Sequence, residues 1–373
     1  MKTMDHNDNQ PIRKRVALHA EKHRKKRRIW AWVLSVFALA TVVVAAYSAY
    51  VYVRTKNAID STYDSSNHVQ IKQGEFNGQR KFAVLLLGTD TGALDRTEKV
   101  GNSDTVIIAV VNPEKKRYTL MSVPRDTMAQ MVGAETFQIE KINAAYPLGG
   151  AAMSMASVSK LVNVPIKYYA LVNMKGIMRL IRYVGGIDIR PNLSFEYGGY
   201  IFKKNQLTHM GGGGALAYSR MRYDDPKGDY GRQQRQRQVI TALIQKTISL
   251  NTLTKLDSVL TSISGNVKTN LTFAALQQIA LNYRDTTKHA KSDYLHGHNA
   301  TIDDVSYQVQ STKELQRVSD YLRAELGLKL LPLKNNETYQ NKRNVARGFD
   351  FSNIATQEYH LYLDYAEPKA GGN

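Results

Sequence analysis

An uncharged segment of 25 residues, Ile29–Val53, restricts the folding of this chain more than any other feature of its sequence. A helix rises about 1.5 Å per residue, so this segment can cross roughly 30 Å of hydrocarbon. Trp30 and Trp32 near one end, and Tyr50 and Tyr52 near the other, match the aromatic belts of the two membrane interfaces. The segment therefore predicts one transmembrane signal-anchor helix.

The charges around this segment predict its orientation. Residues 1–28 contain ten Lys and Arg against three acidic residues, and such basic blocks stay in the cytoplasm. Residues 54–373 would then lie outside the cell, and the protein would reside in the cell membrane with a single pass. A buried core helix and a cleaved signal peptide, with Ala45-Ala46-Tyr47 as its cleavage site, are the alternatives.

The composition excludes several classes of site and partner. The chain has 51 Lys and Arg against 32 Asp and Glu, a formal charge of +19, and no cysteine. Thiolate metal sites, disulfides and cysteine nucleophiles are therefore excluded. The N-terminal basic block can bind anionic headgroups, and no nucleic-acid-binding motif accompanies it, so we expect no nucleic-acid partner. The excess positive charge of the exported part instead favours anionic lipids, polymers or phosphates.

The exported part divides by composition. We expect a polar, membrane-proximal stalk over 54–80, a folded extracellular domain over 81–330 and a disordered tail over 331–373. Within the domain, apolar runs and periodicity predict an α/β fold, a central mixed β-sheet flanked by helices. The expected strands are 82–88, 105–111, 118–123, 168–172, 187–190 and 216–222, and the expected helices are 151–162, 175–184, 231–250, 273–283 and 313–326.

Two aspartates follow or begin these strands. Asp90 comes just after the apolar run 82–88, and Asp104 stands at the start of the next run. Two carboxylates on neighbouring loops could hold one hard divalent ion such as Mg²⁺. For each aspartate alone, the sequence favours a turn or cap residue over a metal ligand.

Basic residues stand near the ends of other elements. Arg125 directly follows the strand 118–123, where it either pairs with an acid such as Asp126 or projects into a site. Arg220 and Arg222 would share one face of the expected strand 216–222. On the following helix, Arg232 and Gln236 share a face near the amino terminus, where the helix dipole favours anions. Converging guanidinium groups predict a phosphate or pyrophosphate clamp.

Two features near these residues are not assigned to the expected phosphate site. Arg235 and Arg237 are expected on a solvated basic helix face with local Asp–Arg pairs. The run Gly211–Gly214 is expected to loosen the approach to the arginine strand, because glycine lowers the cost of alternative backbone conformations.

The ordered motifs GTDTG, SDT, SVPRDT, KINAAY, PIKYYALVN, VGGIDI and ALAYSRMRYDDPKGDYGRQQRQ resemble the LytR-CpsA-Psr family of bacterial cell-envelope proteins over about residues 81–250. The resemblance implies a phosphotransferase that moves a glycopolymer, teichoic acid or capsular polysaccharide, from an undecaprenyl-pyrophosphate carrier to peptidoglycan with Mg²⁺. It implies Asp90 and Asp104 as metal-associated acids. It also implies a pyrophosphate site made of Arg125, Lys141, Arg220, Arg222, Arg232 and Gln236. Arg125, Asp104 and Arg220 are its expected catalytic residues, and Asp104 or another nearby acid would take the acceptor proton.

Three alternatives remain open on the sequence. The Asp90-Thr91-Gly92 triplet resembles an aspartic protease, although such an enzyme needs a second triplet, which the chain lacks. A non-catalytic scaffold that binds an anionic lipid or polymer would need the same basic residues. His296 and His298 could bind a metal, or lie exposed in a polar loop.

Overall fold

The computed structural model describes residues 49–50, 53, 63–67, 69–72, 74–91, 101–249 and 265–366. The chain divides after Arg54, and the second unit, from Thr55 onward, contains the folded domain. Within the described ranges, no helix combines the length and the apolar character needed to cross a membrane. The expected span 29–53 lies outside these ranges apart from Ala49, Tyr50 and Val53.

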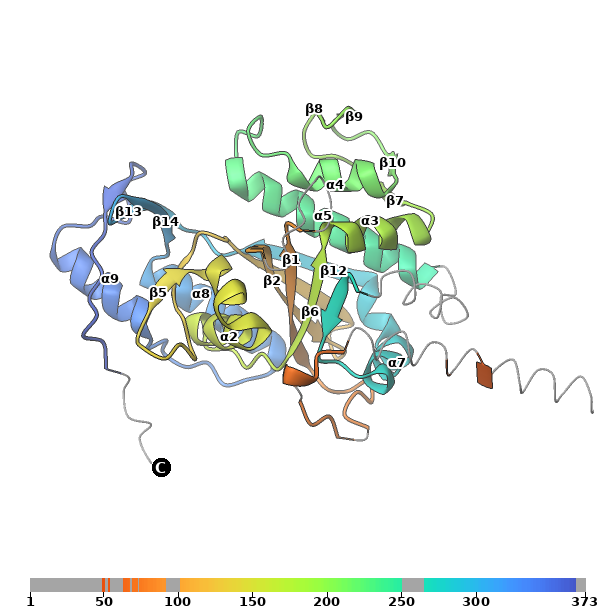
Figure 1. The fold of residues 1–373 in the computed structure, drawn as a ribbon, viewed down its shortest axis with the longest axis horizontal. Coiled ribbons are helices and arrows are strands. Elements are labelled where there is room, and N and C mark those ends of the chain that lie inside the picture. Colours follow the sequence, from red (N-terminus) through yellow and green to blue (C-terminus); the bar gives the residue numbers. More distant parts are fainter. Residues whose placement is uncertain are drawn as a thin grey trace, which may run out of the picture. The chain divides into compact units, whose positions relative to one another are not determined.

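A six-stranded mixed sheet forms the centre of the domain, in the order β11-β6-β1-β2-β3-β12 (Figure 1). Its strands are β1 (Phe82–Thr89), β2 (Ser103–Asn112), β3 (Arg117–Val123), β6 (Tyr168–Asn173), β11 (Val267–Thr269) and β12 (His289–Tyr294). The pairs β1–β6 and β3–β12 are parallel, and the other neighbours are antiparallel. The predicted α/β fold with a central mixed sheet is thus confirmed.

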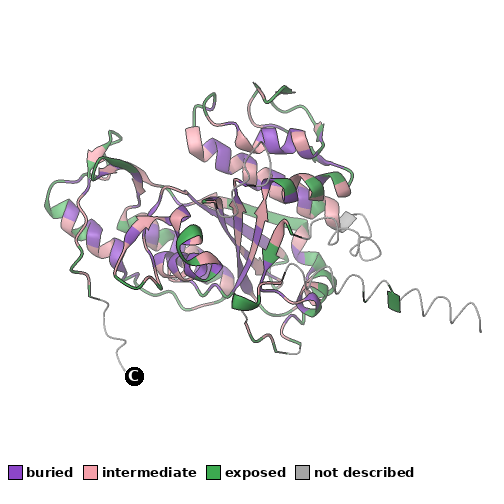
Figure 2. Ribbon diagram, in the orientation of Figure 1, coloured by how far each residue is buried: buried purple, intermediate pink, exposed green. Residues whose placement is uncertain are grey.

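Each face of the sheet packs against its own helices. Alternate residues of β1, such as Leu85 and Leu87, join a buried cluster with α2 (Ala145–Val162) and α8 (Thr312–Leu326). On the opposite face, Ile107 and Leu120 pack with α5 (Gly228–Ser249). The central strands β1, β2 and β3 are therefore buried on both faces, which accounts for their continuous apolar runs (Figure 2).

A helical layer with short hairpins lies on the α5 side of the sheet (Figure 1). It contains α3 (Met174–Tyr183), α4 (Gly212–Arg220) and the strands β7 (Ile187–Ile189), β8 (Phe195–Tyr197), β9 (Tyr200–Phe202) and β10 (Thr208–Met210). The remaining elements are β4 (Met128–Gln130), β5 (Ile139–Lys141), β13 (His298–Ile302), β14 (Val305–Val309), β15 (Gln357–Glu358), α7 (Phe273–Asn282), α9 (Asn336–Ala346) and the 3₁₀ turns Ser65–Asn67, Ile142–Ala144 and Arg284–Lys288.

The expected strand over 216–222 is wrong, because Leu216 lies in the helix α4. The glycine run begins this helix: a Cβ atom on Gly212 would stand 2.4 Å from the backbone oxygen of Met178 in α3. The glycine therefore permits close packing of two helices instead of loosening the segment. Ala215, Leu216 and Ala217 are good helix formers, and this propensity outweighs the short apolar alternation.

The expected disordered tail is also wrong for residues 331–366. This segment forms α9 and β15, and β15 extends the β13–β14 hairpin into a three-stranded sheet. The amide side chains of α9 bond to backbone carbonyls: Asn341 donates to Gln310 (2.8 Å), Asn344 to His360 (2.9 Å) and Gln340 to Tyr362 (2.6 Å). These three amides can thus be buried, because each donates a hydrogen bond within the protein.

The expected stalk does not extend to residue 80. Phe76 is fully buried against Phe82, Tyr168 and Tyr283, and the Asp64 carboxylate accepts a 2.6 Å hydrogen bond from the Tyr169 hydroxyl. The described residues between 63 and 80 are therefore part of the folded domain.

Candidate active site

One edge of the sheet brings three of the predicted residues together. Because β1 and β2 are antiparallel, the end of β1 meets the beginning of β2, which places Asp90 near Asp104. Arg125 follows the end of β3, and its Nη1 lies 3.0 Å from Asp104 Oδ1. Its Nε lies 3.5 Å from Asp126 Oδ2. The expected pairing of Arg125 with an acid and its projection into a site therefore both occur.

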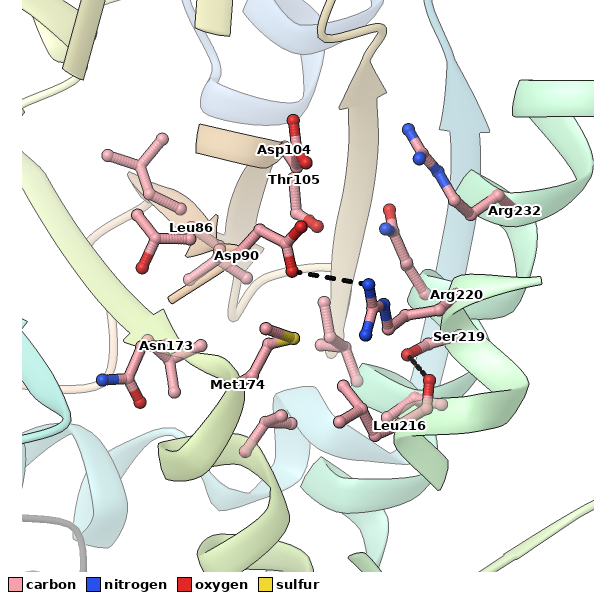
Figure 3. A pocket seen from close by; sticks show the side chains of 18 of the residues that line it. Leu86, Asp90, Asp104, Thr105, Asn173, Met174, Leu216, Ser219, Arg220 and Arg232 are labelled. Atoms are coloured by element: carbon pink, nitrogen blue, oxygen red, sulfur yellow. Dashed lines mark hydrogen bonds and ion pairs between the residues drawn. The ribbon is translucent and has the colours of Figure 1, made fainter. Parts of the chain in front are cut away.

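The helical layer supplies the other predicted groups. Arg220 is the last residue of α4, and its Nη2 lies 3.8 Å from Asp90 Oδ1 (Figure 3). Arg232 extends from α5, where its Nη2 contacts Asp229 Oδ1 at 2.5 Å. In Figure 3 both arginines extend from the helical side toward the carboxylates of the sheet edge.

A cavity of about 520 Å³ lies between these two walls. Seven of the eight predicted site residues line it: Asp90, Asp104, Arg125, Arg220, Arg222, Arg232 and Gln236. The rest of its wall is mainly apolar and comes from β1, β6, β11, α3, α4 and α5, including Leu86, Leu171, Ile177, Leu180, Leu216, Val239, Ile240, Leu243 and Val267. The cavity therefore combines a charged end with an apolar wall.

The charges at this end influence one another. Burial lowers the pKa of Arg232, and the nearby cations of Arg125 and Arg222 lower it further. The carboxylates of Asp229 and Asp104 act to raise this pKa but do not outweigh the lowering effects. Burial also acts to lower the pKa of Arg125, but Asp104 and Asp126 outweigh it and raise that pKa above its ordinary value. The guanidinium groups thus converge closely enough to repel one another.

Arg232 carries an unsatisfied donor. Within the described part of the chain, its buried Nε has no hydrogen-bond partner. A buried guanidinium donor without a partner costs free energy unless a ligand accepts its hydrogen bond. An anionic ligand with several oxygens, such as a phosphate, satisfies this requirement.

Lys141, the eighth predicted residue, lines an adjoining cavity of about 790 Å³. This second cavity shares Asp90, Asp104 and Arg125 with the first and is more polar. Lys141 Nζ lies 3.7 Å from Asp126 Oδ1. The structure therefore places Lys141 in the adjoining cavity, which shares Arg125 with the predicted clamp.

The carboxylate pair fits a hard cation completed by a ligand. Among the described residues, no group of three or more His, Asp or Glu side chains could hold a metal by itself. Mg²⁺ commonly takes one or two carboxylates together with water and phosphate oxygens. Asp90 and Asp104 line the same cavity and match this pattern. The His296 ring instead packs against the Tyr294 ring, with the centroids 4.0 Å apart and the planes tilted by 35°.

The solvated positions expected for Arg235 and Arg237 are wrong. Arg235 is fully buried and binds Asp225 and the backbone oxygens of Tyr218 and Met221. Arg237 is 5% exposed and donates to the hydroxyls of Ser292 (2.6 Å) and Ser122 (2.7 Å). Burial lowers the pKa of Arg237 to about 10. Both arginines hold α5 in place.

Several cavity residues were not predicted. Asn173 ends β6 and caps α3, where its side chain accepts a hydrogen bond from the Gly176 amide. Thr105, Met174, Tyr197 and Ser219 also line the cavity. An asparagine between a strand and a helix could have been recognised as a cap, but the apolar wall has the same periodicity as a core.

The sequence matches the LytR_cpsA_psr family over residues 46–324, which is more than half of the chain. It is 40% identical over 305 residues to the polyisoprenyl-teichoic acid–peptidoglycan teichoic acid transferase TagU of Enterococcus faecalis, covering 82% of this chain and 99% of the relative. The TagU of Bacillus subtilis is 32% identical over 308 residues, covering 82% and 98% of the two chains.

A solved structure from Streptococcus agalactiae has the same fold. Its TM-score is 0.67 at 32% sequence identity, and the alignment covers 75% of this chain and 99% of that one. Together with the family match and the two relatives, this similarity identifies the protein: the chain belongs to the LytR_cpsA_psr family.

Proposed function

We propose that this protein is a phosphotransferase that moves a glycopolymer from a polyprenyl-pyrophosphate carrier to peptidoglycan. The observation that carries this proposal is the convergence of Arg125, Arg220 and Arg232 with two carboxylates at one end of an apolar cavity. The charged end suits a pyrophosphate, and the apolar wall suits an isoprenyl chain. The names of the related teichoic acid transferases support teichoic acid as the glycopolymer.

The residues of the site have distinct roles in this proposal. Arg125, Arg220, Arg222 and Arg232 would neutralise and orient the pyrophosphate, with Gln236 as a further hydrogen-bonding group. Asp90 and Asp104 would hold Mg²⁺, which supplies further neutralisation of the developing phosphoryl charge. Phosphoryl transfer depends mainly on positioning and charge stabilisation, which these groups provide.

The proposed reaction forms one bond to phosphorus and breaks another. An acceptor hydroxyl of peptidoglycan forms a bond to the phosphorus that bears the glycopolymer, and the bond from this phosphorus to the bridging oxygen breaks. Polyprenyl phosphate leaves with the bond electrons, and a nearby carboxylate takes the hydroxyl proton. Asp104 lines both cavities and is our candidate for this base.

We further propose a location at the cell membrane. The uncharged segment 29–53 would anchor the chain, with residues 1–28 in the cytoplasm and the domain outside. This arrangement places the domain on the side where peptidoglycan is assembled, within reach of a lipid-linked substrate.

The full chain in detergent micelles tests this function. We would incubate it with a polyprenyl-pyrophosphate-linked saccharide, peptidoglycan and Mg²⁺, and analyse the peptidoglycan for a phosphodiester-linked saccharide. We expect this product from the natural protein and not from Arg125→Ala or Arg220→Ala. Retention of substrate without any product would indicate a binding scaffold and contradict the proposal.

A further inference from the structure

The second cavity borders the charged end of the first. Asp90, Asp104 and Arg125 line both cavities, so a phosphorus atom held by these groups would be accessible from both sides. The first cavity continues into an apolar wall, whereas the second is lined by Asp126, Glu140, Lys141, Asn143 and Tyr307. The two cavities therefore suit chemically different parts of one reaction.

Phosphoryl transfer requires the attacking group and the leaving group to lie on opposite sides of the phosphorus. The attacking and leaving oxygens lie roughly in line through the phosphorus. If the isoprenyl chain occupies the apolar cavity, the leaving oxygen points toward it. The attacking hydroxyl must then arrive from a side away from the apolar wall, and the second cavity is a polar opening that borders the same charged groups.

The wall of the second cavity contains groups that suit a saccharide. The ammonium of Lys141 lies 5.3 Å from the centre of the Tyr307 ring. Burial and the adjacent Glu140 carboxylate raise the pKa of Tyr307 above its ordinary value. A carboxylate accepts hydrogen bonds from sugar hydroxyls, and an aromatic ring with a polar tip can contact a saccharide through both parts.

Hydrogen bonds fix the wall of the second cavity to the segment that follows Arg125. The backbone amide of Gln308, next to Tyr307 in β14, donates a 2.8 Å hydrogen bond to the backbone carbonyl of Asp126. Gln310 Nε2 donates to Thr127 Oγ1 at 3.1 Å, and Asn341 of α9 donates to the Gln310 oxygen. The C-terminal segment thus supports β14, although it lies beyond the residues matched by the family.

We infer that the second cavity binds the acceptor saccharide, with Tyr307 and Glu140 as residues that contact it. This inference rests on the proposed transferase function and assigns a place to its second substrate. Val305, which is 46% exposed at the same cavity, provides a position where a larger side chain would obstruct the acceptor.

The experiment separates transfer to saccharide from transfer to water. The full chain in micelles is given the lipid-linked saccharide and Mg²⁺, with or without uncross-linked peptidoglycan glycan. We expect Glu140→Gln, Tyr307→Phe and Val305→Trp to raise the KM for the glycan at least about tenfold, while release of saccharide by hydrolysis stays within about twofold. Glu358→Gln, on the exposed outer strand β15, is the matched control and should change neither rate.

Two outcomes would overturn the inference while the transferase function stands. Unchanged glycan KM in all three variants would exclude the second cavity as the acceptor site. An equal fall in hydrolysis and transfer would assign these residues to the donor or to folding. Absence of both products from the natural protein would instead refute the transferase function itself.

Discussion

Arg220 and Arg235 lie on consecutive helices but in opposite environments. The Arg220 side chain is partly exposed and faces Asp90 across 3.8 Å in the cavity. Arg235 is fully buried, and its partner Asp225 is nearly so. A partly exposed pair contributes little to stability, whereas removing one partner of a buried pair leaves an uncompensated charge.

We therefore predict different losses from the same substitution at these two residues. Arg235→Met should lower the free energy of unfolding by about 3–5 kcal/mol, measured by chemical denaturation. Arg220→Met should change it by less than about 1 kcal/mol while reducing transfer at least about 100-fold. Equal destabilisation by the two substitutions would contradict the distinction between a structural and a catalytic arginine.

The buried carboxylate of Glu337 is expected to make stability depend on pH. Its carboxylate in α9 is buried and accepts a 2.9 Å hydrogen bond from the Gln130 amide. Burial raises its pKa above the ordinary value of 4.5, against the lowering effects of backbone hydrogen bonds and of Lys160. Because the folded state binds this proton more tightly than the unfolded state, the contribution is fully present below pH 4.5 and is lost as pH rises through the folded pKa.

Glu337→Gln should remove this dependence. We expect the stability of the variant, relative to the natural protein, to rise as pH increases above 4.5 and to become constant once Glu337 is ionised in the folded state. Denaturation curves from pH 4 to pH 8 measure this difference. A difference that does not vary with pH would show that Glu337 does not titrate with folding.

At the scale of elements, the close packing of α3 and α4 determines where Arg220 lies. Gly212→Ala should lower the free energy of unfolding by about 1–3 kcal/mol, because the new Cβ would meet the backbone of Met178. Gly211→Ala is the control, since no atom lies within 4 Å of its Cβ position and its φ is −74°. Thermal denaturation of the two variants distinguishes them, and similar midpoints would contradict the packing role of Gly212.

At the scale of the whole molecule, the C-terminal segment completes a second core. Tyr359 and Phe349 pack with Ala300, Ile302 and Val309 of the β13–β14 hairpin. A chain that ends at Pro332 should lose this cover, unfold at a lower temperature and be cleaved in the β13–β14 region by limited proteolysis. A chain that ends at Ala366 keeps these contacts and should behave like the natural protein. Unchanged proteolysis of the shorter chain would contradict this role.

Local sequence patterns were sufficient for most of the central fold. The apolar runs of β1, β2 and β3 are long enough to indicate buried strands, and the amphipathic patterns of α3 and α8 indicate helices. Asp90, Asp104 and Arg125 were recognisable because polar residues directly follow or begin apolar strands. These features depend on residues close together in the chain, so the sequence alone determines them.

Only the tertiary structure decided which arginines face the cavity and which hold the core. Arg232 and Arg235 lie in the same stretch of α5, but their surroundings differ. Asp225 and the backbone oxygens of Tyr218 and Met221 pack onto Arg235, whereas the Nε of Arg232 has no hydrogen-bond partner among the described residues. The apolar cavity wall and the buried amides of α9 likewise depend on contacts between separate elements. Periodicity reports which residues avoid water, but the partner that covers each side chain comes from elsewhere in the chain and is known only once it has folded.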